Sequence, residues 1–319
     1  MMKRLRLAII FGCLWPSVSL SHGPRPEVIG LTVSAMPGGG IHALTDNQGV
    51  FAALNFSYKW VCEDAIYPLA RTQGLALFGA DERRWLVATN HGLHISVDGG
   101  CDFQAVGHPL GTERLSGLWK NVSTDAVYTA TASLDAPSRL YGSVDEGRTW
   151  SQLNLAADGV VENIQWIPTE PQRMLVQAAG ALYINGIDGQ TFEPFVVRIN
   201  EQVIPTEFIR HMVTSPVNPD RMLAVVNAGE RTRILLTTDL GQTWQDVALL
   251  DTADVSALFH RTGEQVMVVG LLGGRWKSMD AGATFQREPL GPPTVRCLMR
   301  GSDDWVYACA NPNAEGPFV

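Results

Sequence analysis

An eight-residue pattern recurs along this chain at nearly constant spacing, and it constrains the fold more than any other feature. Complete copies begin with Ser or Thr and have Asp third, Gly fifth and an aromatic residue eighth; they span 96–103, 143–150, 237–244 and 278–285. Two eroded copies precede and interrupt these. Residues 53–60 keep only Asn55 and Trp60, and 185–192 have Ile187 in the Asp position. Periodicity of this kind is typical of repeat architectures.

The spacing of the copies predicts the size of the repeating unit. Their final aromatic residues are separated by 43, 47, 42, 52 and 41 residues. That length fits four short strands with their turns, which is one blade of a β-propeller. Apolar runs of strand length flank the copies, for example Arg84–Thr89 and Gly92–Ser96. No helical periodicity of useful length is present, so we expect an all-β fold.

Each position of the octapeptide has a mechanical role in a tight turn. An Asp side chain can accept hydrogen bonds from backbone N–H groups, and a Ser or Thr hydroxyl can make a second such bond. Glycine adopts a positive φ without steric cost. The aromatic residue begins the next strand and buries its ring. All these roles are structural, so the acids of the octapeptides are not expected to be catalytic.

The octapeptides resemble the Asp-box, also called the bacterial neuraminidase repeat. This repeat occurs in sialidases, sortilin-type receptor domains, xyloglucan-degrading glycosidases and photosystem II assembly factors. The resemblance covers about residues 27–319 and implies a single β-propeller domain over 22–319. It also implies that the octapeptides join the third and outermost strands, away from the ligand-binding face. The residues assigned to these turns are Asp98, Gly100, Phe103, Asp145, Gly147, Trp150, Asp239, Gly241, Trp244, Asp280, Gly282 and Phe285.

The number of octapeptides predicts at least six blades. Residues 294–299 and 305–309 have the pattern of the first two strands of a seventh blade. We therefore expect seven four-stranded antiparallel blades with the last one incomplete. Either Val28–Val33 closes the ring by strand exchange, or the chain is a truncated form of a longer one, because all-β proteins avoid open strand edges.

The first 21 residues have the pattern of a secretory signal peptide. Lys3, Arg4 and Arg6 precede a short apolar run, and cleavage is expected after Ser21. The alternative is a lipoprotein signal with Cys13 as the modified residue. We expect a secreted or periplasmic protein without a transmembrane segment in its mature form, and a monomer.

The charge balance restricts the class of partner. Removing residues 1–21 takes away three of the 24 basic residues and no acids, so the formal charge changes from −8 to −11. An acidic chain does not favour nucleic acid or anionic membrane surfaces. A protein or a polysaccharide is the expected partner.

Four cysteines remain after the signal segment, and an even number in an exported chain suggests disulfides. Cys62 follows the first repeat aromatic and Cys101 lies in the second octapeptide, so we predict a Cys62–Cys101 bond between neighbouring blades. Cys297 and Cys309 flank a turn and could face each other across a hairpin, but their pairing stays open. No Cys-x-x-Cys pair occurs, and no metal or cofactor is expected.

No complete catalytic set is found in the sequence. A sialidase would need an Arg-Ile-Pro motif near the first blade, but that region reads Val28–Val33 without an arginine. A glycosidase needs two carboxylates facing each other across its substrate. His91 and His94, the only close histidine pair, would not converge on one metal ion in a strand-loop-strand region.

The remaining binding candidates are charged residues in loops between blades and between second and third strands. They are Arg198, Glu201, Glu207, Arg231 and Arg233. Solvated loop charges are the ordinary interpretation of such residues. The function expected from the whole pattern is an exported, non-catalytic binding or scaffold propeller. The alternatives are a sialidase-like glycoside hydrolase with a non-standard carboxylate pair, and an assembly factor.

Overall fold

The protein is described from a computed structural model. It describes residues 8–9, 28–34, 40–45, 48–54, 57–121, 123–133, 136–167, 170–186, 188–204, 209–253, 255–270, 274–288, 295–300 and 306–310. The chain divides into two compact units, residues 1–118 with 295–319, and residues 119–294. Each unit is described by itself.

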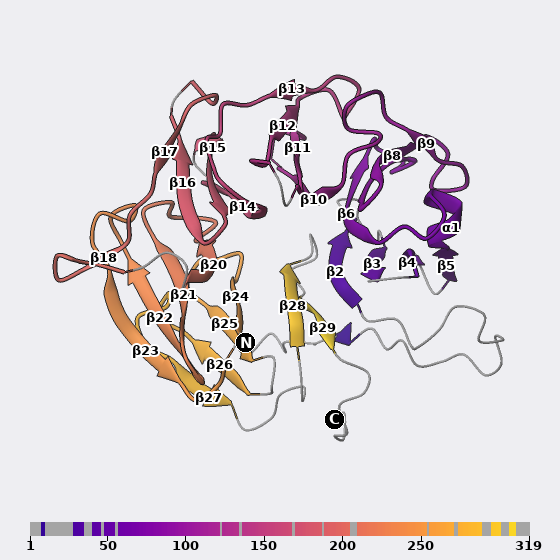
Figure 1. Cartoon of the computed structure of the whole chain (residues 1–319). Helices are drawn as coiled ribbons and strands as arrows, with labels where there is room; N and C mark the ends of the chain where they lie inside the picture. Colours follow the sequence, from indigo (N-terminus) through magenta and orange to yellow (C-terminus); the bar gives the residue numbers. More distant parts are fainter. Residues whose placement is uncertain are drawn as a thin grey trace. The chain divides into compact units, whose positions relative to one another are not determined.

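Six four-stranded antiparallel sheets form the blades, and the strands of each blade follow one another in sequence (Figure 1). The first blade contains β2 (Val28–Val33), β3 (Ile41–Thr45), β4 (Val50–Leu54) and β5 (Ser57–Val61). The second contains β6 (Thr72–Phe78), β7 (Arg84–Thr89), β8 (Gly92–Ser96) and β9 (Gln104–Ala105). The third contains β10 (Leu115–Lys120), β11 (Val127–Thr131), β12 (Leu140–Ser143) and β13 (Ser151–Gln152).

The other three complete blades lie in the second unit. They are β14 (Val161–Ile167), β15 (Glu170–Ala178), β16 (Ala181–Asn185) and β17 (Phe192–Pro194); β20 (Ile209–Thr214), β21 (Met222–Ala228), β22 (Arg231–Thr237) and β23 (Gln245–Leu250); and β24 (Val255–Phe259), β25 (Val266–Gly270), β26 (Arg275–Ser278) and β27 (Gln286–Glu288). The predicted all-β class and the four-stranded blades are confirmed.

The predicted count of seven blades is corrected to six. The two strands expected after the last octapeptide form as β28 (Val295–Arg300) and β29 (Val306–Ala310), but the third strand of their sheet is the two-residue β1 (Ala8–Ile9), which pairs in parallel. Strand exchange by Val28–Val33 is also wrong, because this segment pairs with β3 as the first strand of the first blade.

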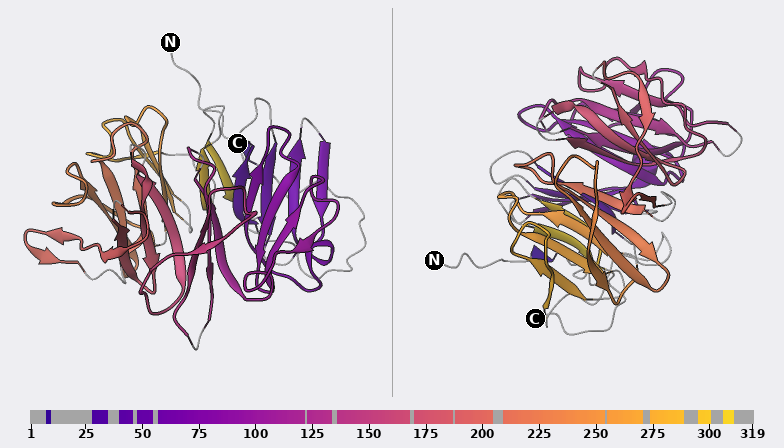
Figure 2. Two further views of the ribbon diagram at one scale, coloured as in Figure 1. Left: turned by 90° about the horizontal axis from the view of Figure 1, so that it is seen from above. Right: turned by 90° about the vertical axis from the view of Figure 1, so that its left-hand side faces the viewer.

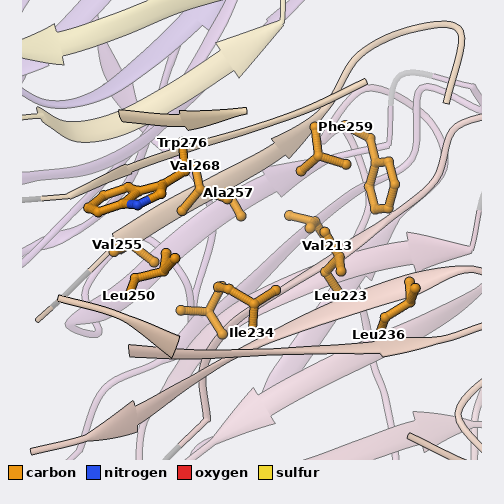
Figure 3. Close-up of a cluster of buried hydrophobic side chains, with 12 residues drawn as sticks. Val213, Leu223, Ile234, Leu236, Leu250, Val255, Ala257, Phe259, Val268 and Trp276 are labelled. Carbon is orange, nitrogen blue, oxygen red and sulfur yellow. The ribbon is translucent and has the colours of Figure 1, made fainter. Parts of the chain in front are cut away.

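Packing between blades explains why the second strand of a blade is apolar along its whole length. All five residues of β25 are buried, and so are the first five of β21. In the second unit the side chains of two adjacent blades form one core, in which Leu223 and Ile234 meet Val255 and Val268 (Figure 3). A strand covered on both faces cannot alternate between apolar and polar residues, so it appears as a continuous apolar run.

The octapeptide turns form the hydrogen bonds expected of them. In the third blade, Asp145 accepts bonds from the Ser143 hydroxyl at 2.7 Å and from the Thr149 N–H at 2.9 Å, and its second oxygen accepts from the Thr149 hydroxyl at 2.6 Å. The Ser143 hydroxyl oxygen accepts the N–H of Gly147 at 2.9 Å. One carboxylate and one hydroxyl thus satisfy the backbone of the whole turn.

The eroded copy at 185–192 keeps its turn through a neighbouring acid. Asp188 accepts bonds from the N–H groups of Gln190 and Thr191, each at 3.0 Å, and from the Thr191 hydroxyl. The carboxylate has therefore moved one residue along the chain, and Ile187 lies outside the described residues. The other eroded copy, at 53–60, also falls partly outside them.

Two small elements interrupt the pattern of blades. A single helical turn, α1 (Glu63–Ile66), follows β5, and the hairpin of β18 (Arg198–Ile199) and β19 (Gln202–Val203) follows β17. The hairpin stands away from the four-stranded sheets of its unit (Figure 2). No helix among the described residues has the length and apolar character needed to cross a membrane.

The predicted Cys62–Cys101 disulfide is not formed, and both thiols are free. Cys101 lies in the octapeptide turn of the second blade, whereas Cys62 follows the last residue of β5, at the other end of its blade. The prediction placed both residues near one rim and overlooked that β5 carries the chain from one end of the blade to the other. Cys297 and Cys309 are register partners in β28 and β29.

Thiol accessibility tests this cysteine assignment. Cys62 and Cys101 are expected to be alkylated by iodoacetamide in denaturant without reductant, because neither sulfur is bonded to another. Peptide mass spectrometry of the digest would report each modification, and a peptide linking the two residues would contradict the structure. The same digest tests the expected Cys297–Cys309 bond.

Glycine substitutions test the octapeptide turn. Gly241 has φ +86°, and a Cβ there would lie 2.3 Å from Phe195, on the preceding blade. Gly229 has φ +77°, but a Cβ there would meet nothing within 4 Å. Both Gly→Ala variants are expected to lose about 1–2 kcal/mol of unfolding free energy from the left-handed backbone. Gly241→Ala should lose more, because Phe195 must move. Equal losses in urea titrations would show that the turn is not packed against the preceding blade.

Candidate ligand-binding end of the blades

The two ends of each blade differ in what they carry. The octapeptide turn joins the third and fourth strands, so it lies where the first strand ends and the second begins; we call this the octapeptide end. The start of the first strand, the turn between second and third strands, and the link to the next blade lie at the other end, which we call the bulge end. Pairing in the second blade shows this, because Thr72 lies opposite Thr89 and Thr89 opposite Gly92.

The acids of the octapeptide end are engaged in their own turns. Asp98 accepts bonds from the Ser96 hydroxyl and from two backbone N–H groups, and these bonds lower its pKa to about 2. The hydroxyls of Thr284 and Ser278 are the main causes that lower the pKa of Asp280 to about 2. Carboxylates held ionised by fixed donors are poor proton donors at neutral pH. Their geometry agrees with the structural role predicted for them.

The bulge end carries the same irregularity in five sheets. The ladder between first and second strand shifts register at the second residue of β2, β6, β14, β20 and β28, while β24 pairs without a shift. The residues left without a direct partner are Ile29, Gln73, Glu162, Arg210 and Arg296. A β-bulge redirects a side chain and is often found beside functional sites. Repetition at one position marks this end as the candidate site.

Buried hydrogen bonds hold the bulge of β20 from both sides. Gln177 of the preceding blade is 6% exposed, and its Nε2 donates to the Ile209 carbonyl oxygen at 2.6 Å. His211 Nε2 lies 3.3 Å from the carbonyl oxygen of Ala257 on the following blade, which makes Nε2 the protonated nitrogen. Burial lowers the pKa of His211, and the Ala257 carbonyl opposes this shift. The backbone that carries Arg210 is therefore fixed to both neighbouring blades.

The first unit has comparable bonds between its first two blades. The Thr72 hydroxyl donates to the Thr45 carbonyl oxygen at 2.6 Å, and the Thr32 hydroxyl donates to the Leu75 carbonyl oxygen at 3.2 Å. First strands are edge strands of their sheets, so their outer backbone groups need partners from elsewhere. Side chains of the adjacent blade supply some of these partners.

An aromatic cluster covers part of the bulge end in the first unit. The Tyr67 ring stacks on His91 at 5.0 Å and lies 5.5 Å from the ring of His94. The loop that carries Tyr67 is anchored by two hydrogen bonds, from Arg71 N–H to the Asn90 side-chain oxygen and from Asn90 N–H to the Arg71 carbonyl oxygen. Tyr67 remains 43% exposed, so the cluster offers an aromatic surface to solvent.

Leu69 is displayed next to this cluster in a strained conformation. It is 84% exposed and has φ +61°, while its N–H donates to Asp64 Oδ1 at 3.2 Å. A bulky residue in the left-handed region is uncommon. Leu240, in an octapeptide turn, has a similar φ of +57°, so the backbone conformation alone does not distinguish Leu69. Leu69 and Tyr67 both expose apolar surface on this loop, which makes the pair a candidate for ligand contact.

His94 is buried beneath the aromatic surface. It is 2% exposed, and burial lowers its pKa, with the Gly92 carbonyl opposing and the charge of His91 adding to the shift. The structure brings His91 and His94 together around Tyr67. A group of three potential ligands does occur nearby, since one ligand atom each from Cys62, Glu63 and Asp64 lies within 4.8 Å of the others.

A second buried histidine lies in the first blade. The His42 ring meets Trp85 edge-on at 5.1 Å, and the Lys59 ammonium lies 5.6 Å from the same indole. Lys59 donates to the Gly99 carbonyl oxygen and lies 3.3 Å from Cys101 Sγ. Burial, followed by the charge of Lys59, lowers the pKa of His42 to about 4.

The residues predicted from the sequence to bind ligand belong to the second unit, whereas the Tyr67 cluster belongs to the first. Arg198 and Glu201 lie in the exposed hairpin of β18 and β19, and Glu207 lies outside the described residues. Arg231 forms an ion pair with Asp251 at 3.3 Å. Arg233 pairs with Asp246 across β22 and β23 at 2.6 Å. The structure does not gather these residues into one site, and two of them have acidic partners within their own blade region.

Sequence reasoning missed the bulged residues and the Tyr67 cluster. The bulged side chains share no chemical type, so no motif marks them, and a bulge becomes visible only in the pairing of two strands. Tyr67 had one signal available, because an aromatic residue beside Pro68 in a loop between blades interrupts the strand pattern.

Comparison with known proteins supports the fold. No protein-family model matches the chain, and no curated protein matches it in sequence. Among solved structures, an ancestral GH74 enzyme aligns with a TM-score of 0.66 at 15% identity, over 89% of this chain and 43% of the enzyme. This chain therefore spans less than half of that enzyme's length. YCF48 bound to D1 peptide aligns with a TM-score of 0.65 at 15% identity, over 92% and 93%.

A second YCF48 structure, from Cyanidioschyzon merolae, aligns with a TM-score of 0.60 at 12% identity, over 91% of this chain and 96% of that one. Identities this low show the fold and leave the activity open. The chain is accordingly a β-propeller with four-stranded antiparallel blades, similar both to enzymes and to proteins that bind or assemble with others.

The pH dependence of stability tests the environment of His42. The pKa of His42 is about 4 in the folded protein, below its ordinary value of 6.5, so below pH 6.5 the unfolded chain takes up a proton that the folded chain does not. Its contribution to stability is complete above pH 6.5 and is lost as the pH falls toward 4. His42→Phe keeps an apolar ring beside Trp85 and removes this proton. It should reduce the stability lost between pH 7.5 and 5 by about 2 kcal/mol.

Urea titrations at the two pH values measure the free energy of unfolding at each pH. For each protein the change between pH 7.5 and pH 5 is compared, so a difference in absolute stability between the variants cancels. His108→Gln, at an exposed histidine, is the matched control and is expected to leave the pH dependence unchanged. A full pH dependence in His42→Phe would show that His42 is not the group responsible.

Proposed function

We propose that this chain is an exported, non-catalytic binding propeller that takes its ligand at the bulge end of its blades. The observation that supports this most directly is the bulge at the second residue of the first strand in five sheets. A bulge bends and twists an edge strand, and it also turns one side chain away from the ladder, as bulges beside functional sites do. Its repeated presence is accounted for if these side chains contact a ligand.

Under this proposal the octapeptide end of each blade has a structural role and the bulge end binds the ligand. At the octapeptide end, hydroxyls and carboxylates bond to their own turns, as Ser143 and Asp145 do, and leave little bonding capacity for a ligand. Apolar side chains are exposed at both ends, as Leu69 and Val144 show, but the exposed aromatic residue Tyr67 lies at the bulge end. We infer from the turn geometry that the octapeptides are Asp-boxes, which in that family lie away from the ligand face.

A protein segment or a polysaccharide is the proposed ligand class. The acidic charge of −8 opposes nucleic acid as a partner. The likeness to YCF48, solved with a D1 peptide, supports a protein segment, because that structure shows that a propeller of this kind can hold a peptide. Export is proposed from the first 21 residues and stands independently of the ligand. Cleavage after Ser21 would also remove β1, which pairs with β29 in the full chain.

Substitutions at the two ends test where the ligand binds. Leu69→Gly removes an 84% exposed side chain and relieves its positive φ, and Gln73→Ala removes a bulged side chain. Val144→Ala is the matched control, because Val144 is 85% exposed on an octapeptide turn. Ligands would first be found by screening the native protein on peptide and glycan arrays.

Leu69→Gly and Gln73→Ala are expected to weaken binding severalfold without lowering the melting temperature, and Val144→Ala to leave both unchanged. Weakened binding in Val144→Ala alone would place the ligand at the octapeptide end and refute the proposal. Hydrolysis of a glycan by the native protein would refute the non-catalytic part and favour a glycoside hydrolase.

A further inference from the structure

Two bulged residues of opposite charge occupy equivalent positions on consecutive blades of the second unit. Glu162 is the bulged residue of β14, and Arg210 is the bulged residue of β20. Both side chains are exposed, and neither forms an ion pair with any residue that the structure describes. Other charges on these blades are paired, as Arg233 with Asp246 and Arg173 with Glu170 show.

The backbone beneath these two charges is fixed. Gln177 lies opposite Asn163, next to the bulge of β14, and donates its side-chain N–H to the carbonyl of Ile209, at the bulge of β20. One buried amide therefore links the two bulges. His211 bonds the far side of the second bulge to Ala257. A fixed backbone removes the cost of ordering the main chain on binding, so only the two side chains lose conformational freedom.

We propose that Glu162 and Arg210 form a polarity-selective pair that binds a peptide segment carrying a basic side chain toward Glu162 and an acidic side chain toward Arg210. This assignment rests on the proposed function, since it names the chemistry of the ligand at the bulge end. The argument is charge complementarity. A guanidinium forms a fork that matches a carboxylate, and a carboxylate accepts from lysine or arginine.

The size of the effect follows from exposure. Ion pairs between exposed groups contribute modestly, about two- to fivefold in affinity for each pair. Their larger effect is on selectivity, because placing like charges opposite each other is unfavourable. Such pairs also weaken as salt is raised, since the screening length falls to about 3 Å at 1 M. The pair is therefore expected to set the direction of the peptide more than its total affinity.

A charge swap tests the proposal directly. The variant Glu162→Arg with Arg210→Glu keeps the net charge and reverses the polarity of the pair. The matched control is Glu146→Arg with Arg148→Glu, which reverses an exposed pair joined at 2.9 Å in an octapeptide turn. The probes are fluorescein-labelled twelve-residue peptides in solution, with one lysine and one glutamate, in both orders and at separations of zero to six residues. Binding is followed by fluorescence anisotropy, and folding by circular dichroism.

The native protein is expected to prefer one order of lysine and glutamate by about fourfold or more, and the swap at 162 and 210 to invert that preference. The swap at 146 and 148 should leave it unchanged, and 1 M salt should abolish it. A swap at 162 and 210 that folds and binds with the native preference would refute this inference. The proposed function would then still stand if Leu69→Gly and Gln73→Ala weaken binding, and it would fail separately if they do not.

Should the double variant fail to fold, Arg210→Gln supplies the same readout. This single change is expected to remove the preference for one order of lysine and glutamate while the protein still binds the peptides. Retention of the full preference in a folded Arg210→Gln protein would overturn the assignment.

Discussion

The hydrogen bonds of one carboxylate in each octapeptide turn hold the end of a blade together. Asp145, for example, takes bonds from two backbone N–H groups and two hydroxyls within a stretch of seven residues. A turn this tight lets the third and fourth strands pair without a long connection, so the outer strand can be as short as two residues. Packing then builds on that frame in the second unit, because the turn glycines Gly241 and Gly282 lie against Phe195 and Leu223 of the preceding blades. Both the repeat of the sequence and the stacking of the blades depend on this interaction.

Fixing one end of every blade leaves the other end free to vary. The links between blades differ in length and content, from the single helical turn after β5 to the hairpin after β17. The bulges are found at this end, and the bonds that support them come from neighbouring blades rather than from the bulged side chains. The side chains of Gln177 and His211 form the hydrogen bonds that hold the bulge of β20, so the Arg210 side chain is not needed for this purpose. The hydrogen-bonding groups of the octapeptide end are used within its own turns, whereas the bulge end varies from blade to blade. This difference indicates the bulge end as the functional one, although the recurring acids of the octapeptides lie at the other end.

The repeating part of the structure could be predicted from the sequence. Features that depend on how two strands pair could not. The octapeptides predicted their turns, the strand class and the four-stranded blade, since the relevant bonds lie within eight residues. Asp188 shows the limit even there, because its carboxylate serves the turn from a position that the motif does not assign. The Cys62–Cys101 prediction failed because it ignored the length of β5. Bulges cannot be read from one strand at all, since Gln73 and Glu162 become equivalent only once each is aligned with its partner strand.

Residues other than Arg210 support the β20 bulge, and this affects how such a protein can evolve. Where a recognition residue also holds the fold, each new specificity must be reached through less stable intermediates. Here position 210 can accept another side chain while Gln177 and His211 keep the backbone in place. Substitution at that position is thereby separated from the survival of the domain. A scaffold built this way can be diversified in the laboratory by randomising the bulged positions, and its lineage could have acquired new partners by the same route.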